Sequence, residues 1–144
     1  MRGIARSTRS TGSGGPGADW GLLLLRLGAG ATMLSHGLPK LLSFAEKAAR
    51  FPDPFGLGST ASLGLTVFAE VGCALALILG LYTRLASIPL IITMAVAAFV
   101  IHADDAFGRK ELALLYLLVF VALALLGPGP HSIDGRVRKK LGWW

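Results

Sequence analysis

The stretch LALLYLLVFVALALL, residues 112–126, decides the fold class of this chain because it contains no charged side chain. A helix on the surface of a soluble bundle keeps a polar face, whereas this segment would be apolar on every side. Helices of that kind lie in lipid or in the core of a much larger protein. The stretch therefore predicts a helix that lies in a membrane.

Three other apolar runs, residues 20–44, 63–81 and 85–101, accompany this stretch. A hydrocarbon core ~30 Å thick requires roughly 20 apolar residues per helix, and all four runs come close to that length. Of the 144 residues, 53% are hydrophobic and 15% are charged, whereas about 25% are charged in an average soluble domain. We therefore predict an all-α fold, a transmembrane four-helix bundle, rather than a soluble four-helix bundle.

Basic residues stand on both flanks of the apolar region. Three arginines precede the first run, Arg84 follows the second, and four basic residues follow the last: Arg136, Arg138, Lys139 and Lys140. Because loops rich in lysine and arginine stay on the cytoplasmic side, this pattern predicts both termini in the cytoplasm. Basic flanks beside apolar spans also favour anionic lipid over nucleic acid as the partner of the positive net charge.

The runs divide the chain into three predicted parts. Residues 1–18 are rich in glycine and serine and predict a disordered cytoplasmic leader. Residues 19–135 form a four-span membrane domain, in which Asp19 is the expected N-cap of the first helix. Residues 136–144 form a basic interfacial tail that ends in two tryptophans. The proline-rich and glycine-rich loop between the first two runs, residues 43–62, is expected to cover the outer end.

Cysteine usage excludes one class of membrane redox enzyme. Cys73 is the single cysteine of the chain, so no intrachain disulfide can form. A dithiol oxidoreductase with an intrachain CxxC pair is therefore excluded. We expect Cys73 to be a small packing residue.

Five ionisable residues fall within or beside the apolar runs, where an unpartnered charge costs several kcal/mol. A rise of ~1.5 Å per residue places four of them about 20–25 Å from the cytoplasmic face and the fifth, Arg26, about 9 Å from it. The four are His36, Glu70, His102 and Glu111. We predict that they form one polar layer, with His36 as the partner of Glu70, and that Arg26 stands apart from Glu70.

This layer is the candidate polar intramembrane site, and its residue types leave several uses open. Imidazoles and carboxylates suit a proton or quinone site because their protonation is readily tuned. His36 and His102 could also ligate a b-type haem, but their spacing carries no specific signature, so haem b is disfavoured. The layer offers no thiolate, and no metal is predicted. In the structural alternative, the polar groups hydrogen-bond to one another and fix the helix packing.

Short motifs extend over most of residues 20–135. They are RL at 26–27, SHGLPK at 35–40, Glu70, LGLYTR at 79–84, and GPGPHSID at 127–134. In this order and spacing they resemble the DoxX family of small four-helix membrane proteins. The resemblance implies a four-span inner-membrane protein, with members linked to quinone-coupled sulfur oxidation, respiratory oxidase complexes or oxidative-stress assemblies. It also implies shared polar positions, without a catalytic assignment: Arg26, His36, Lys40, Glu70 and Glu111.

These observations predict a DoxX-like multi-pass protein of the inner (plasma) membrane that supports a quinone-linked redox or oxidative-stress process. The cofactor is left unknown, with a quinone as one candidate and haem b disfavoured, and the lipid bilayer is the expected partner. Redox partner subunits and a homo-oligomer are both left open, as is whether the chain is an enzyme or a non-catalytic subunit of an oxidoreductase complex. The alternative is a non-catalytic membrane scaffold or assembly protein whose buried polar layer is structural.

Overall fold

The structure, a computed structural model, describes residues 15–141, and these residues are helical without any β-strand. The elements, in chain order, are α1 (Pro16–Leu42), α2 (Phe44–Ala48), α3 (Ser59–Val67), η1 (Phe68–Cys73), α4 (Ala74–Leu79), α5 (Thr83–Val96), η2 (Ala97–Ile101), α6 (Phe107–Leu126) and α7 (Ile133–Leu141). The segments η1 and η2 are π-helical turns. They lie within two continuous helices, Ser59–Leu79 and Thr83–Ile101. The prediction of an all-α fold is confirmed.

Helix boundaries differ from the sequence predictions at two places. The first helix begins at Pro16, so Asp19 lies in its first turn and is not the N-cap. Proline is favoured at the start of a helix because its missing N–H would have no partner there. The helix of the last run begins at Phe107, which places Glu111 beyond its first turn. Residues 1–14 of the predicted leader and both terminal tryptophans lie outside the described residues.

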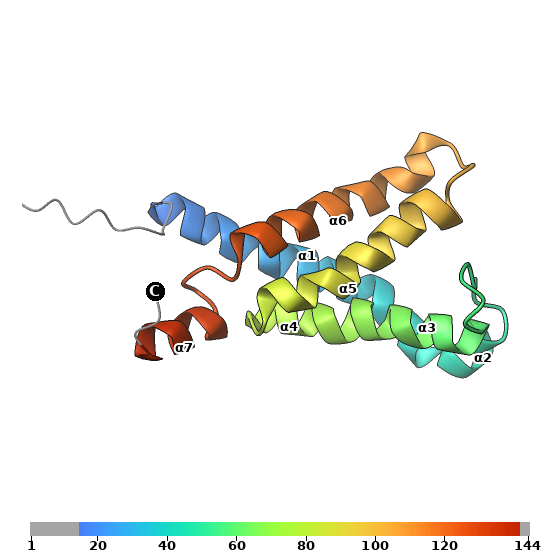
Figure 1. Cartoon of the computed structure of the whole chain (residues 1–144), viewed down its shortest axis with the longest axis horizontal. Coiled ribbons are helices and arrows are strands. Elements are labelled where there is room, and N and C mark those ends of the chain that lie inside the picture. Colours follow the sequence, from blue (N-terminus) through green and yellow to red (C-terminus); the bar gives the residue numbers. More distant parts are fainter. Residues whose placement is uncertain (1–14, 142–144) are drawn as a thin grey trace, which may run out of the picture.

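A tight turn at residues 80–82 joins α4 to α5, two residues earlier than the gap between the second and third apolar runs. Gly80 ends α4 with φ of 70°, a left-handed conformation that glycine adopts without steric penalty. Three residues separate the two helices, so α4 and α5 are antiparallel neighbours. Figure 1 shows this turn close to α7, near the end of the molecule where α1 begins.

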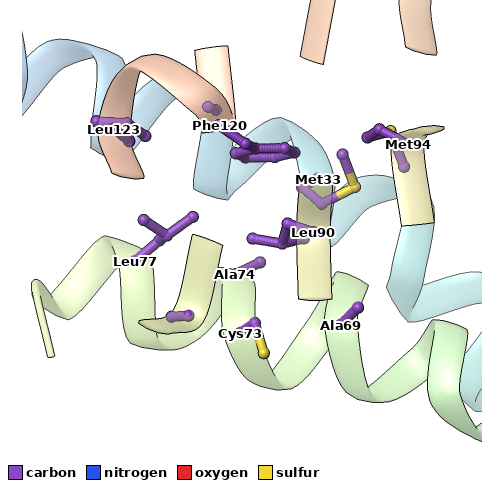
Figure 2. Packing of buried hydrophobic residues seen from close by; sticks show 11 residues of the cluster. Met33, Ala69, Cys73, Ala74, Leu77, Leu90, Met94, Phe120 and Leu123 are labelled. Carbon is purple, nitrogen blue, oxygen red and sulfur yellow. The ribbon is translucent and has the colours of Figure 1, made fainter. Parts of the chain in front are cut away.

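The core lies where α1, the η1–α4 segment, α5 and α6 meet. Figure 2 shows Met33, Leu77, Leu90 and Phe120 pointing toward one another from these four elements. The side facing them on η1 and α4 is made of small residues: Ala69, Cys73 and Ala74. Small residues let helices approach closely, which is the usual way that helices pack in membranes. The buried position of Cys73 agrees with the predicted packing role.

The outside of the helices is strongly apolar. Leu24, Leu118 and Leu125 are 69%, 67% and 73% exposed, and many other large apolar side chains face outward along the same helices. Such a surface is unfavourable in water and favourable in lipid. Ser59–Leu79 and Thr83–Ile101 are each long and apolar enough to cross a membrane.

Candidate functional site

The central contact of the candidate site is an ion pair between α1 and η1. Lys40 Nζ lies 2.5 Å from Glu70 Oε2, and the Glu70 side chain is 4% exposed. The two backbones come together at Gly37, where an added Cβ would lie 2.8 Å from Glu70 Cβ. Glycine is therefore required at position 37 for α1 to approach Glu70 this closely.

The Lys40–Glu70 pair lies on the wall of a pocket of about 330 Å³. The helix Ser59–Leu79 and the helix Thr83–Ile101 form two walls, and the loop after α2 forms a cover. The wall is mainly apolar; its polar side chains are Lys40, Glu70, His102, Ser62, Thr66 and Thr93. An apolar pocket with a few convergent polar groups is the usual form of a small-molecule site.

Both helical walls contain a π-helical turn. The first, η1, carries Glu70, and the second, η2, carries Ala97 and Ile101 of the pocket wall. A π-turn inserts an extra residue into the helix and so changes the direction in which the following side chains point; such turns are frequent at functional sites. The two helices that form the pocket are thus locally distorted where they line it.

The cover is formed by residues 51–57, which contribute Phe51 and Phe55 to the pocket. Asp53 holds this segment in shape. Its carboxylate accepts hydrogen bonds from the Gly58 N–H (2.7 Å), the Ser62 hydroxyl (2.9 Å) and the Leu57 N–H (3.0 Å). These donors, the Gly58 N–H foremost, stabilise the ionised carboxylate and lower the pKa of Asp53. The expectation that the loop lies as a cover agrees with this arrangement.

His102 stands at the rim of the pocket with a carboxylate beside it. Its Nδ1 lies 2.7 Å from Asp105 Oδ2. The hydrogen bond to His102, followed by the charge of Arg109, lowers the pKa of Asp105. A carboxylate on Nδ1 orients an imidazole so that Nε2 is left to exchange a proton elsewhere.

The other two members of the predicted polar layer do not line this pocket. His36 is exposed, and its ring meets the Tyr116 ring edge-on at 5.9 Å between centroids. Glu111 is exposed on α6. The predicted His36–Glu70 pair is wrong, because Glu70 is paired with Lys40. Among residues 15–141, no group of three or more histidine, cysteine and acidic side chains is placed to hold a metal ion.

The sequence analysis included Lys40 among the polar positions shared with the DoxX family, but it did not place Lys40 in the predicted polar layer. Counting backbone depth alone places Lys40 about 6 Å beyond His36, at ~1.5 Å per residue. Side chains on a helix lean toward its N-terminus, so the long Lys40 side chain reaches back toward Glu70. This lean, together with a lysine and a glutamate on neighbouring antiparallel helices, was the signal that could have identified the pair.

Arg26 forms a second buried polar cluster, as its predicted separation from Glu70 implies. The guanidinium donates to the carbonyl oxygens of Pro128 (2.5 Å) and His131 (2.6 Å), and Arg26 is 2% exposed. The loop that carries these carbonyls is further tied down by the Gly80 carbonyl, which accepts from the Asp134 N–H at 3.0 Å. Arg26 thus fixes the segment between α6 and α7 to the start of the bundle.

The Arg26 cluster leads directly into α7. Ser132 precedes this helix, and its hydroxyl caps the first turn by accepting from the Gly135 N–H at 2.9 Å. Asp134 Oδ2 accepts from the Thr83 N–H at 3.1 Å, which joins α7 to the α4–α5 turn. The GPGPHSID motif is therefore a structural joint between the bundle and the basic C-terminal helix.

Comparisons with known proteins support the resemblance to the DoxX family that these motifs indicated. The sequence profile of the DoxX family matches residues 21–103. An uncharacterized protein of Haemophilus influenzae is 31% identical over 133 residues, covering 87% of this chain and 88% of that protein. An uncharacterized membrane protein of Mycobacterium tuberculosis is 30% identical over 145 residues, covering 83% and 82%.

The inner membrane protein YqjF of Escherichia coli is 28% identical over 126 residues, covering 85% of this chain and 95% of that protein. No solved structure matches this chain at a significant level. The family match covers more than half of the chain and includes Arg26, Lys40 and Glu70. The chain therefore belongs to the DoxX family of membrane proteins.

Proposed function

We propose that this protein binds the ring of a quinone in the pocket beside Lys40 and Glu70 and supports a quinone-linked redox process in the inner membrane. The observation that carries the proposal is the buried Lys40–Glu70 ion pair, 2.5 Å long, on the wall of an otherwise largely apolar pocket. A quinone has a flat apolar ring with carbonyl oxygens at its edge. Lysine donates hydrogen bonds and carries no acceptor, so Lys40 suits a carbonyl oxygen.

Glu70 and His102 supply the proton chemistry of this site. Reduction of a quinone to a quinol takes up two electrons and two protons. The electrons come from a partner redox subunit, and the protons pass through side chains that can bind and release them. Glu70, paired with Lys40, and His102, oriented by Asp105, are two such groups on the same pocket. Carboxylates and imidazoles inside membranes commonly serve in such relays.

The ligand enters from the bilayer. Leu65 and Ile92 line the pocket and are also 58% and 56% exposed on the outside of the helices. A hydrophobic ligand dissolved in lipid reaches such an opening without crossing water. Residues 51–57 also line the pocket, and Asp53 holds this segment in shape.

The topology that suits this function has four spans with both termini in the cytoplasm. Two of the spans are the helices Ser59–Leu79 and Thr83–Ile101; α1 and α6 supply the other two. Basic residues at the two ends of the chain support this orientation. The start of α1 and the basic helix α7 then lie on the cytoplasmic side.

A non-catalytic membrane scaffold is the second candidate function. The Arg26 cluster favours it, because both terminal nitrogens of the buried Arg26 guanidinium donate to backbone carbonyls of the loop after α6 and so tie that loop to α1. Under this alternative the Lys40–Glu70 pair is likewise a cross-link between α1 and η1 and binds no ligand. The two candidates differ in one measurable respect, which is whether Glu70 affects quinone affinity.

Equilibrium titration with the short-chain analogue decylubiquinone distinguishes them. We expect the full-length wild-type protein in detergent to bind it and Glu70→Gln to bind roughly tenfold to a hundredfold more weakly. Without the Glu70 carboxylate the Lys40 ammonium loses the ion pair that holds it in the pocket wall, and the quinone carbonyl loses the charge-assisted hydrogen bond that Lys40 would donate. Glu111→Gln is the matched control, since Glu111 is exposed and outside the pocket; its dissociation constant should stay within about twofold of the wild type. Equal affinity of the two variants, or no binding by the wild type, contradicts the proposal.

A further inference from the structure

A second groove lies at the end of the molecule that carries α7. It has a volume of about 410 Å³ and is formed by the α4–α5 turn on one side and α7 on the other. Its apolar wall includes Leu85, Ile133 and Val137, and its rim carries Arg84 and Arg138. Neither the quinone pocket nor the Arg26 cluster includes these two arginines.

The charges around this groove are mainly positive and exposed. Arg84 and Arg138 are both exposed, and three further basic residues extend along α7: Arg136, Lys139 and Lys140. The single acidic group in the groove wall, Asp134, already accepts the Thr83 N–H at 3.1 Å. Arg84 makes a long contact of 3.4 Å to the Leu125 carbonyl and retains its other donors. Two exposed guanidinium groups with spare donors therefore face a groove in which Asp134 is the one acidic side chain among the described residues.

We propose that this groove binds one anionic phospholipid, with the phosphate between Arg84 and Arg138 and an acyl chain along Leu85 and Val137. Guanidinium groups bind phosphate oxygens in a bidentate manner, which gives them an advantage over point charges. Leu85, 65% exposed, begins the outward face of α5, so an acyl chain leaving the groove continues along the apolar side of the bundle. The combination of a charged rim and an apolar wall matches a lipid better than free phosphate, which would make no use of that wall.

The position of α7 agrees with this occupant. Figure 1 shows α7 beyond the ends of α4, α5 and α6, at the same end of the molecule as the start of α1. The helix is nine residues long, and four of these are basic. Its apolar side chains Ile133 and Val137 are 39% and 48% exposed. A short basic helix with an apolar side lies at the level of the lipid head groups. The Arg26 cluster and the Thr83–Asp134 contact hold it there.

Native mass spectrometry of the full-length protein, purified in detergent and supplied with either phosphatidylglycerol or phosphatidylcholine, tests this inference. The wild type should retain one phosphatidylglycerol, and should retain phosphatidylcholine much less. The double variant Arg84→Gln/Arg138→Gln should bind phosphatidylglycerol roughly 20-fold more weakly, since each basic residue near an anionic head group contributes about a factor of five. The double variant Arg109→Gln/Lys110→Gln is the matched control at the opposite end of the bundle and should retain the lipid as the wild type does.

Salt dependence of the wild type is an independent readout that needs no variant. Retention of phosphatidylglycerol should fall as ionic strength rises, because exposed charges are screened. Equal retention of the two lipids by the wild type would overturn the inference. So would equal loss of lipid in both double variants, or titration showing that inorganic phosphate alone displaces the lipid at similar affinity.

Discussion

Replacing Arg26 by methionine should lower the free energy of unfolding by about 3 kcal/mol, the largest effect we expect from a single substitution outside the pocket. The guanidinium donates two charge-assisted hydrogen bonds, to the carbonyls of Pro128 and His131, and each such bond contributes roughly 1.5–3 kcal/mol. Methionine fills similar space but donates nothing, so both buried carbonyls lose a partner. Reversible unfolding in mixed micelles measures the change.

The same substitution should release the C-terminal joint before the rest of the bundle unfolds. Limited proteolysis should therefore cut Arg26→Met within residues 127–135 under conditions that leave the wild type intact. Arg109→Met is the control, because the Arg109 side chain is 74% exposed and should change stability by less than about 0.5 kcal/mol. Unchanged stability and unchanged cleavage of Arg26→Met would show that the joint is held by other contacts.

Replacing Lys40 by methionine should also destabilise the protein by about 3 kcal/mol. The substitution leaves Glu70 buried and without its partner, and breaking a buried ion pair from one side costs roughly 3–5 kcal/mol. The effect falls at the low end because the Lys40 side chain is 27% exposed, so the pair is not fully withdrawn from its surroundings. The double variant Lys40→Met/Glu70→Gln should recover part of the loss, since it leaves no unpaired charge.

A double-mutant cycle in mixed micelles measures this coupling. We expect an interaction free energy of about 1–3 kcal/mol between positions 40 and 70. Lys47→Met is the matched control, because Lys47 is exposed and its ammonium makes one long contact of 3.4 Å to the Pro39 carbonyl. Additive losses at positions 40 and 70 would mean that the two side chains do not act as a pair.

Hydrophobic patterning predicted the helices well because each depends on the sequence of its own segment. Most of each apolar run lies in a helix, but the turn falls at Gly80 and Leu81, inside the end of the second run, because α4 ends at Leu79. The ends were less accurate: Pro16 extends α1 beyond the apolar run, and Phe107 begins α6 before it. Helix ends depend on local capping and on loop contacts, which an apolar pattern does not record.

Side-chain partners were harder to predict than depth. Depths estimated from the helical rise per residue correctly separated Arg26 from Glu70. The same estimate made His36 and Glu70 partners, because their backbones lie at similar depth. Depth says nothing about which face of a helix a residue occupies. His36 faces Tyr116, whereas Lys40 reaches Glu70. The π-turns in two helices also change side-chain directions after them, and no periodicity of 3.6 residues anticipates that change.

For the loop that covers the pocket, the sequence predicted where it lies but not the contacts that hold it. Proline, glycine and aromatic residues indicated a segment that lies on the outer end, but the three hydrogen bonds to Asp53 depend on a fold of several residues at once. A single aspartate in a loop carries no signature of such a network. The pocket itself joins segments from residue 40 to residue 102, so its shape depends on tertiary packing.

The most direct test of the central claim is to find where a quinone binds. Photoaffinity labelling of the full-length protein with an azido-quinone, followed by peptide mapping, should label residues 51–66 and 92–102, which surround the Lys40–Glu70 pocket. Excess decylubiquinone should prevent the labelling. Labelling confined to the apolar groove between α1 and α6, beside Leu24, Gly28 and Leu115, would contradict the claim, because that groove offers neither Lys40 nor Glu70.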